Sequence, residues 1–170
     1  GGRCSGAMIN ANTVIAAGHC VHSGGAHGSW YKWAKVYPAK DGRSSPFGFC
    51  AAKKLYSVVG WVKKRNPNYD FGVIKLNCNV GNRTGWMGFW SQSQSLVNTG
   101  ATISSYPGDK PLEQWAHTDK VRSNSSLKTY YKTDTVGGNS GSGVFTTKKD
   151  CGKCIHTVHA YGSSSNNSGT

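Results

Sequence analysis

The sequence is poor in acidic residues and contains no long apolar run. Its 170 residues include 7 Asp and Glu against 20 Lys and Arg, a formal net charge of +13. No apolar run approaches the roughly 18–20 residues of a membrane span, so we expect no membrane partner. The first residues do not have the pattern of a signal peptide, and we expect any secretory leader to have been removed. No internal repeat recurs at a fixed period.

The composition favours an all-β fold. Glycine is abundant, with 23 residues, and short β-branched runs alternate with turns rich in Ser and Asn. No sustained amphipathic helix is visible. A chain of this length forms one domain, or two small barrels that share an interface. We expect strands at residues 7–9, 13–17, 33–37, 53–59, 72–76, 101–105, 114–121, 128–133, 143–147 and 155–160.

Two segments stand apart from the predicted strands. Residues 80–94 are rich in Gly and Trp and are interpreted as the connection between two halves, whereas the polar tail 163–170 is expected to be a loop or a frayed end. The expected division of the chain is an N-terminal barrel half (1–80), a connecting segment (81–97) and a C-terminal barrel half (98–170).

The positive charge by itself is compatible with binding to nucleic acid or to an acidic surface. The cluster Lys63-Lys64-Arg65 precedes a Pro-Asn turn and is interpreted as a solvated loop. The six tryptophans are scattered among core-like residues, and no nucleic-acid-binding signature is present. We therefore expect no nucleic-acid partner. The charge is interpreted as a field that steers acidic substrates, with plain solubility as the alternative.

Residues 138–142 read Gly-Asn-Ser-Gly-Ser and offer a candidate nucleophile. Small neighbours leave room for a carbonyl group to reach the Ser140 hydroxyl. Glycine at 138 allows a backbone N–H to point at the oxygen of that carbonyl. The same letters also fit an ordinary turn, so the motif needs supporting groups elsewhere in the chain.

A serine hydroxyl is a poor nucleophile unless a base takes its proton and a third group orients that base. The candidate base is His19, at the tip of the apolar segment 14–20. The candidate orienting acid is Asp70, which opens the alternating apolar strand at 71–76. Taken singly, His19 also fits a core histidine, and Asp70 also fits a turn or cap residue.

These segments resemble the three triad motifs of chymotrypsin-like serine proteases. They are residues 16–20 (Ala-Ala-Gly-His-Cys), 69–74 (Tyr-Asp-Phe-Gly-Val-Ile) and 137–142 (Gly-Gly-Asn-Ser-Gly-Ser). The sequence is most similar to the V8-like, bacterial-type glutamyl endopeptidases, which tend to have Asn before the serine. They also have a segment like residues 105–110 (Ser-Tyr-Pro-Gly-Asp-Lys). The resemblance covers about residues 4–162.

The resemblance implies an all-β fold of two six-stranded antiparallel β-barrels with the active site between them. Homologues extend further at both ends, so we expect barrels that are incomplete there or a fragment of a longer chain. The implied activity is a serine endopeptidase that works without a cofactor through an acyl-enzyme. The implied site residues are the triad His19, Asp70 and Ser140, the oxyanion hole Gly138 and Ser140, and the substrate-pairing edge Ala160, Tyr161 and Gly162.

The resemblance also implies a substrate pocket that selects Glu, and less readily Asp, before the cleaved bond. In the glutamyl branch a histidine and a threonine bind the carboxylate, and the matching positions are His159 and Thr135. Asp134 favours a different substrate preference, because an acid six residues before the serine binds Arg or Lys in trypsin-like enzymes. A trypsin-like or broad preference therefore stays open.

Six cysteines favour an oxidising compartment, so we expect a secreted protein. Six cysteines allow fifteen pairings. The resemblance implies the bridge Cys4–Cys20, and with it we expect Cys50–Cys78 and Cys151–Cys154. The last pair, with His156 and His159 close behind, also suits zinc or free thiols. In an extended strand Cys154 and His156 share one face and His159 lies on the other, so we expect a disulfide and no metal.

Two other function classes stay open: a protease-like binding protein without catalysis, and a basic module that binds nucleic acid or glycan. Asn139 stands where chymotrypsin-type zymogens have an acid that pairs with a new N-terminus. We therefore expect no such insertion switch, although a zymogen activated by cleavage elsewhere stays open. The expected partners are protein or peptide substrates and a propeptide or protein inhibitor, with the protein itself a monomer.

Overall fold

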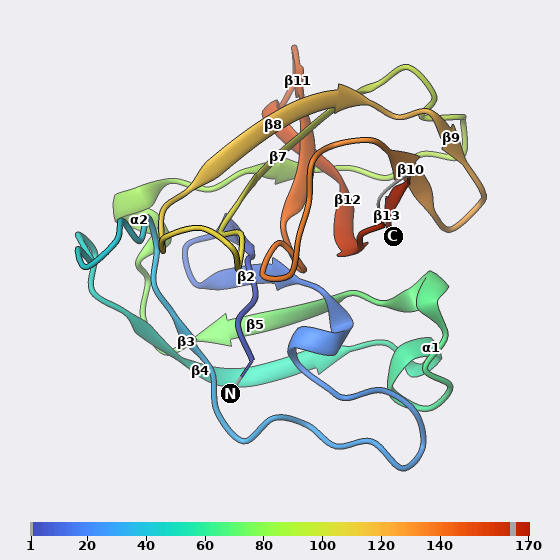
Figure 1. Ribbon diagram of the computed structural model, residues 1–170. Helices are drawn as coiled ribbons and strands as arrows, with labels where there is room; N and C mark the ends of the chain where they lie inside the picture. Colours follow the sequence, from blue (N-terminus) through green and yellow to red (C-terminus); the bar gives the residue numbers. More distant parts are fainter. Residues whose placement is uncertain (1, 164–165) are drawn as a thin grey trace.

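Two curled antiparallel sheets make up the protein, one in the lower half of Figure 1 and one in the upper half. The computed structural model describes residues 2–163 and 166–170. No helix within this described part is long and apolar enough to span a membrane. The first sheet uses residues between 7 and 76, and the second uses residues between 88 and 169. The boundaries expected at 80 and 97 stay a prediction.

The first sheet has five strands in the order β1-β2-β5-β4-β3. Alternation of apolar and polar residues along β5 turns Ile74 and Leu76 into the core, where they meet Val14 from the neighbouring strand β2. Its strands are β1 (Ala7–Asn10), β2 (Thr13–Ala16), β3 (Lys35–Val36), β4 (Cys50–Ser57) and β5 (Gly72–Leu76).

The second sheet has eight strands. Seven follow the order β8-β7-β11-β12-β13-β10-β9, and β6 pairs in parallel with β12. Its core includes Ile103, Val144 and the fully buried Tyr131. The strands are β6 (Gly88–Phe89), β7 (Gly100–Ser105), β8 (Trp115–Lys120), β9 (Ser123–Asn124), β10 (Thr129–Tyr131), β11 (Gly143–Lys148), β12 (Gly152–Tyr161) and β13 (Asn167–Gly169).

Among the described residues, helical structure is limited to single turns. α1 (Val59–Val62) follows β4, and α2 (Gly81–Thr84) lies in the predicted connecting segment. A 3-10 turn at Gly18–Cys20 directly follows β2, and another at Pro67–Tyr69 precedes β5. The two 3-10 turns matter for function, because they place His19 and Asp70 at the same end of two strands that pair with each other.

The all-β fold with two barrel-like halves is confirmed, but the strand numbers are five and eight rather than six and six. The strand expected at 72–76 has those bounds. The strand expected at 53–59 begins at Cys50 and ends at Ser57, because residues 59–62 turn into α1. Three short strands, β6, β9 and β13, were not expected, since segments of two or three residues carry no periodicity to detect.

The tail at 163–170 was expected to be a loop or a frayed end, and for residues 167–169 this is wrong. They form β13, which pairs with both β10 and β12. Thr170 extends this pairing through reciprocal backbone hydrogen bonds with Val158, at 2.8 and 3.1 Å. The polar composition suggested an exposed segment, but these side chains are buried among other polar groups. Residues 164–165 of the tail lie outside the described residues.

The interpretation of the tryptophans as core residues is also largely wrong. Trp61 is 3 % exposed, but Trp33 is 71 % exposed, Trp86 55 %, Trp115 47 % and Trp30 43 %. A sequence shows which residues are apolar but not how much apolar area the sheets can cover. In a chain built from small curled sheets, several large rings are left at the surface.

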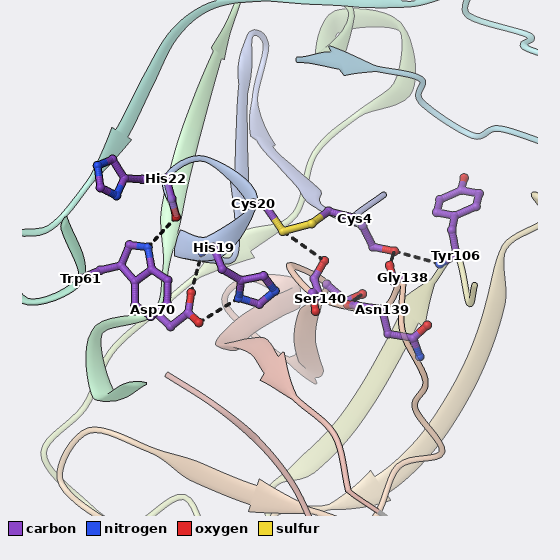
Figure 2. The surroundings of a disulfide bond; sticks show 12 residues. Cys4, His19, Cys20, His22, Trp61, Asp70, Tyr106, Gly138, Asn139 and Ser140 are labelled. Carbon is purple, nitrogen blue, oxygen red and sulfur yellow. Dashed lines mark hydrogen bonds and ion pairs between the residues drawn. A yellow bond between two sulfur atoms is a disulfide. The ribbon is translucent and has the colours of Figure 1, made fainter. Parts of the chain in front are cut away.

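Three disulfides link cysteines in the pairs Cys4–Cys20, Cys50–Cys78 and Cys151–Cys154. The first joins the segment before β1 to the turn that carries His19 (Figure 2). The second joins the start of β4 to the segment after β5. The third closes the turn between β11 and β12. Each bridge restricts the unfolded chain, and closing a loop of about 15 residues contributes about 3 kcal/mol in the chain-entropy account.

Replacing Asn167 by Ala tests the role of the tail strand. The Asn167 side chain is buried, donates to the Thr133 carbonyl and accepts hydrogen bonds from Thr135 and Ser163. Its loss leaves the buried Thr133 carbonyl without this donor, so we expect the free energy of unfolding in urea to fall by about 2–3 kcal/mol.

The matched control is Asn166→Ala, because Asn166 is the exposed neighbour and its hydrogen bonds to other described residues use its backbone alone. This variant should stay within about 0.5 kcal/mol of the parent. Equal unfolding free energies for the two variants would contradict a structural role for the tail strand.

Candidate active site

His19 and Asp70, 51 residues apart, meet through two hydrogen bonds. The backbone N–H of His19 donates to Asp70 Oδ1 at 2.8 Å, and the ring Nδ1 lies 2.8 Å from Asp70 Oδ2. Asp70 is fully buried, whereas the His19 side chain keeps 32 % of its exposure. The carboxylate therefore fixes the orientation of the ring and leaves its other nitrogen, Nε2, free for chemistry.

Tyr161 supplies a further donor to the same carboxylate, because its hydroxyl donates to Asp70 Oδ2 at 2.5 Å. Burial favours the neutral form of the Asp70 carboxyl. The hydrogen bonds and charge of His19, together with the Tyr161 bond, outweigh burial and hold the pKa of Asp70 below its usual value. Burial, followed by this bond, raises the pKa of Tyr161 far above its usual value.

Ser140 lies on the other side of the His19 ring from Asp70 in the view of Figure 2. Within the described part of the chain its hydroxyl makes no hydrogen bond to the ring. Such contacts are often long until a substrate is bound. Cys20 Sγ lies 3.8 Å from the Ser140 carbonyl oxygen, but this sulfur belongs to a disulfide and has no proton to donate. The contact brings the His19 turn against the serine without being a hydrogen bond.

The segment before Ser140 depends on glycine. Gly138 has φ +98°, a left-handed conformation that side chains rarely adopt, and a Cβ there would lie 2.6 Å from the Tyr106 carbonyl oxygen. The Gly137 carbonyl accepts a hydrogen bond from Gly108 N at 2.5 Å. Because the C=O and N–H of one peptide unit point in opposite directions, the Gly138 N–H is turned away from Gly108.

Two backbone N–H groups in this segment are available for a ligand. In the described ranges, Gly138 N and Ser140 N donate to no protein acceptor, although Asn139 N donates to the Val136 carbonyl and Gly141 N to the His159 carbonyl. Two unoccupied N–H donors on either side of Asn139 match an oxyanion hole, in which such groups donate hydrogen bonds to the oxygen of a bound substrate.

Ser5 connects this segment to the N-terminal half through hydrogen bonds, and no sequence motif identifies it as a site residue. Its hydroxyl donates to the Gly138 carbonyl at 2.8 Å and accepts from Tyr106 N at 2.9 Å, while its N–H donates to the Ser140 carbonyl at 2.8 Å. Ser5 directly follows Cys4, whose disulfide to Cys20 is drawn in Figure 2, so this bridge restricts the position of Ser5. Residues 105–110 therefore support the free donors instead of forming a separate site.

An open pocket of about 610 Å³ adjoins Ser140. His159 forms part of its wall and is 2 % exposed. Its Nδ1 lies 2.8 Å from the hydroxyl of the buried Tyr131. Burial, with a further contribution from the charge of His19, lowers the pKa of His159 to about 4, so the ring is neutral at pH 7. The lining residues are Lys132, Thr133, Asp134, Thr135, Val136, Gly137, Ser140, His159, Gly162, Ser163 and Asn167.

The pocket brings together three of the expected specificity residues, Asp134, Thr135 and His159. The Thr135 hydroxyl already donates to Asn167 Oδ1 at 2.8 Å, so its proton is engaged within the protein. Asp134 is exposed, and the exposed Lys132 lies in the same wall with the opposite charge. Tyr131, Asn167 and Lys132 were missed, since each depends on pairing between strands distant in sequence.

Ala160, Tyr161 and Gly162 follow His159 at the end of β12. Gly162 is exposed and lines the pocket, whereas Ala160 is 5 % exposed. The Tyr161 side chain is directed to Asp70. Pairing of this edge with a substrate backbone stays a prediction.

The candidate metal-ligand clusters among the described residues are unsuited to binding a metal ion. One group of potential ligands comes close together, Cys4, His19 and Cys20, but its two sulfurs are bonded to each other. The zinc alternative at 151–159 also fails, because Cys151 and Cys154 form a disulfide. His156 Nε2 pairs with the Gly100 carbonyl and His159 with Tyr131.

Comparisons with known proteins agree with this geometry. The sequence matches the family model Trypsin over residues 1–170. It is 40 % identical over 177 residues to a "Glutamyl endopeptidase" of Bacillus licheniformis, covering 99 % of this chain and 55 % of the relative. It is also 40 % identical over 169 residues to an "Extracellular metalloprotease" of Bacillus subtilis, covering 98 % and 53 %. The chain thus spans about half the length of these relatives.

A solved structure of a Glu endopeptidase in complex with MPD has a similar fold. The TM-score is 0.88 at 31 % sequence identity, over 98 % of this chain and 78 % of that one. The metal implied by the name of the Bacillus subtilis relative finds no fitting donor set among the described residues here.

Replacing Tyr161 by Phe tests the third donor to Asp70. Asp70 has a lowered pKa, so its ionised form contributes stability above its unfolded value of 3.8, and this is lost as the pH falls through the folded pKa. The variant should unfold more easily at pH 7, by about 1.5–3 kcal/mol, and the difference should shrink at pH 3. Urea unfolding at both pH values measures it.

Tyr69→Phe is the matched control, because the Tyr69 hydroxyl, next to Asp70 in the chain, has no hydrogen-bond partner in the described structure. It should stay close to the parent at both pH values. A loss for Tyr161→Phe that is the same at pH 3 as at pH 7 would contradict a bond to the charged carboxylate.

Proposed function

The chain belongs to the trypsin family of chymotrypsin-like serine proteases, and we propose that it hydrolyses peptide bonds through Ser140, His19 and Asp70. The observation that carries this proposal is the His19–Asp70 pair, oriented by two hydrogen bonds, beside a serine that lines an open pocket. A hydroxyl nucleophile needs a base with a free nitrogen and a group that fixes the base, and both are present.

In the proposed reaction the Ser140 hydroxyl attacks the peptide carbonyl while His19 Nε2 takes its proton. The imidazolium is stabilised by Asp70 and then gives the proton to the leaving amine, which leaves an acyl-enzyme. Water hydrolyses this ester through the same base. The free Gly138 and Ser140 N–H groups would stabilise the tetrahedral oxyanion, and loss of one such donor in a comparable enzyme costs about 2.7–4 kcal/mol of barrier.

Labelling with a serine-reactive phosphonate tests this assignment, with the modified residue located by mass spectrometry. We expect one label on Ser140 of the folded protein, none on Ser140→Ala, and a loss of hydrolysis in that variant of about 10⁴-fold or more. Ser142→Ala is the neighbouring control for the labelling site. Absence of label on correctly folded protein would instead favour a protease-like binding protein.

We further propose that the pocket accepts Glu, and less readily Asp, before the cleaved bond. His159 is neutral and buried, and when its Nδ1 accepts a hydrogen bond from the Tyr131 hydroxyl, the ring proton is on Nε2, which can donate to a ligand. A carboxylate that accepts from such a buried donor gains a charge-assisted hydrogen bond. The exposed Lys132 adds positive charge to the same wall. Identity to a relative named glutamyl endopeptidase supports the same conclusion.

Asp134 supports the second candidate, a preference for Arg or Lys. It lines the same pocket, but its exposure and the nearby Lys132 weaken its attraction for a cation. Thr135, expected to help bind the substrate carboxylate, would first have to release Asn167. We therefore assign the selective contact to His159 rather than to Thr135 or Asp134.

Matched peptides with Glu, Gln, Asp or Arg before the cleaved bond test the preference. We expect kcat/KM for Glu to exceed that for Gln by about 10- to 150-fold, the equivalent of a hydrogen bond to a charged group of about 1.5–3 kcal/mol. Tyr131→Phe, which removes the hydroxyl that sets the His159 tautomer, should reduce this ratio.

Asp134→Asn is the control and should leave the preference for Glu in place. A preference for Arg that Asp134→Asn abolishes would overturn the assignment of His159 and support the trypsin-like alternative.

We also propose that the protein acts outside the cell. Three disulfides and the name of the extracellular relative support this location. Protein substrates follow from the proposed activity. A propeptide, a protein inhibitor, activation from a zymogen and a monomeric state stay predictions.

A further inference from the structure

A hollow of about 450 Å³ lies on the surface of the first sheet, between the segment 30–33 and strand β4. It is separate from the pocket beside Ser140, with which it shares no lining residue. We call it the lysine–tryptophan hollow. Its lining residues are Trp30, Tyr31, Lys32, Trp33, Ala52, Lys53, Lys54 and Leu55.

Large aromatic side chains are unusually exposed in this hollow. Trp33 is 71 % exposed, Tyr31 47 % and Trp30 43 %. All three residues line the hollow, so their exposed rings face the same space. Adjoining apolar area on a soluble protein typically marks a binding surface, and tryptophan is the residue type that contributes most at such surfaces.

The charge around the hollow is one-sided. Residues 1–80 contain eleven lysines and arginines against two aspartates, Asp41 and Asp70. Asp70 is fully buried. Lys32, Lys53 and Lys54 form no ion pair within the described residues. None of these three charges is neutralised by an ion pair in the described structure, so together they attract an anionic partner.

The hollow is connected to the segment that carries His19. Trp30 forms a β-bridge with His22, and their rings meet edge to face at 4.9 Å. The His22 carbonyl accepts from Trp61 Nε1 at 2.9 Å, and the Trp61 ring centroid lies 6.3 Å from that of His19. A chain bound in the hollow would thus lie against the same loop that positions the proposed base.

We propose that the lysine–tryptophan hollow is a docking site for an acidic segment of the protein substrate, away from the cleaved bond. The proposal rests on the proposed protease function. Its cations are all lysines, with no arginine in the lining. Arginine is the residue suited to phosphate and nucleic acid, because its planar fork binds two oxygens at once. A peptide that alternates carboxylates with apolar side chains can meet both the lysine charges and the exposed tryptophan area of this lining.

Binding can be measured without cleavage by using Ser140→Ala protein and a short fluorescein-labelled peptide of Asp, Gly and Leu. We expect saturable binding by fluorescence anisotropy that weakens as salt is added. Lys53→Gln combined with Lys54→Gln should weaken it about three- to tenfold, the loss expected for two surface ion pairs.

Lys63→Gln combined with Lys64→Gln is the matched control. Both lysine pairs are exposed and belong to the same half of the chain, but Lys63 and Lys64 do not line the hollow. Equal weakening by the two double variants would overturn the proposal, since the general field would then explain binding. Trp33→Ala tests the apolar part and should weaken binding with no change in net charge.

Competitors decide the chemical class of the occupant. Unlabelled acidic peptide should displace the probe, whereas a neutral peptide of Asn, Gly and Leu should not. Displacement by oligo-dT or heparin at lower concentrations than the acidic peptide would overturn the assignment in favour of a nucleic acid or a sulfated glycan.

Kinetics with the active protein separate this proposal from the proposed function. For a protein substrate with an acidic segment away from the cleavage site, the Lys53/Lys54 variant should raise KM about three- to tenfold with kcat unchanged. A short peptide without such a segment should be cleaved as well by the variant as by the parent. Peptide binding without any hydrolysis would contradict the proposed function alone, and hydrolysis with no effect of the variant would contradict this docking site alone.

Discussion

The buried carboxylate of Asp70 is the constraint on which the rest of the site depends. A fully buried charge is costly unless donors surround it, and three donors converge on Asp70: the His19 N–H, His19 Nδ1 and the Tyr161 hydroxyl. His19 belongs to the first half of the chain and Tyr161 to the second. Satisfying one charge therefore fixes the histidine ring and joins the two sheets at the place where a substrate would enter.

Hydrogen bonds between the two halves of the chain also hold the segment before Ser140 in place. Ser5 comes from the first half, yet it makes three hydrogen bonds to residues 106, 138 and 140 of the second. The Gly108 N–H donates to the Gly137 carbonyl, so the Gly138 N–H points to the opposite side and meets no acceptor among the described residues. A backbone N–H group without an acceptor is unfavourable, so a segment with two such groups needs support from elsewhere. The contacts of Ser5 and Gly108 and the disulfide next to Ser5 hold the segment in this conformation.

Features that depend on neighbouring residues could be predicted from the sequence, and features that depend on residues distant in the chain could not. Residues 72–76 alternate over a whole strand, and the motifs around residues 19, 70 and 140 combine residue types that rarely occur together by chance. The strand at 167–169 has no such pattern, because Asn167 is buried by its bonds to Thr133 and Thr135 rather than by apolarity. Ser5, Tyr131 and the Tyr161 hydroxyl act across distant strands, which no local pattern records.

Two features favour acidic substrates at different distances: the net positive charge acts from afar, and the neutral His159 ring acts on contact. The field of the +13 chain raises the local concentration of acidic segments but does not distinguish Glu from Asp, and salt screens it within about 10 Å. Discrimination has to come from contact in the pocket. A ring with a pKa of about 4 carries no charge before binding. The proposed selection therefore depends on the directed Nε2–H donor of the neutral ring, which a carboxylate accepts on contact, and not on a positive charge already present in the pocket.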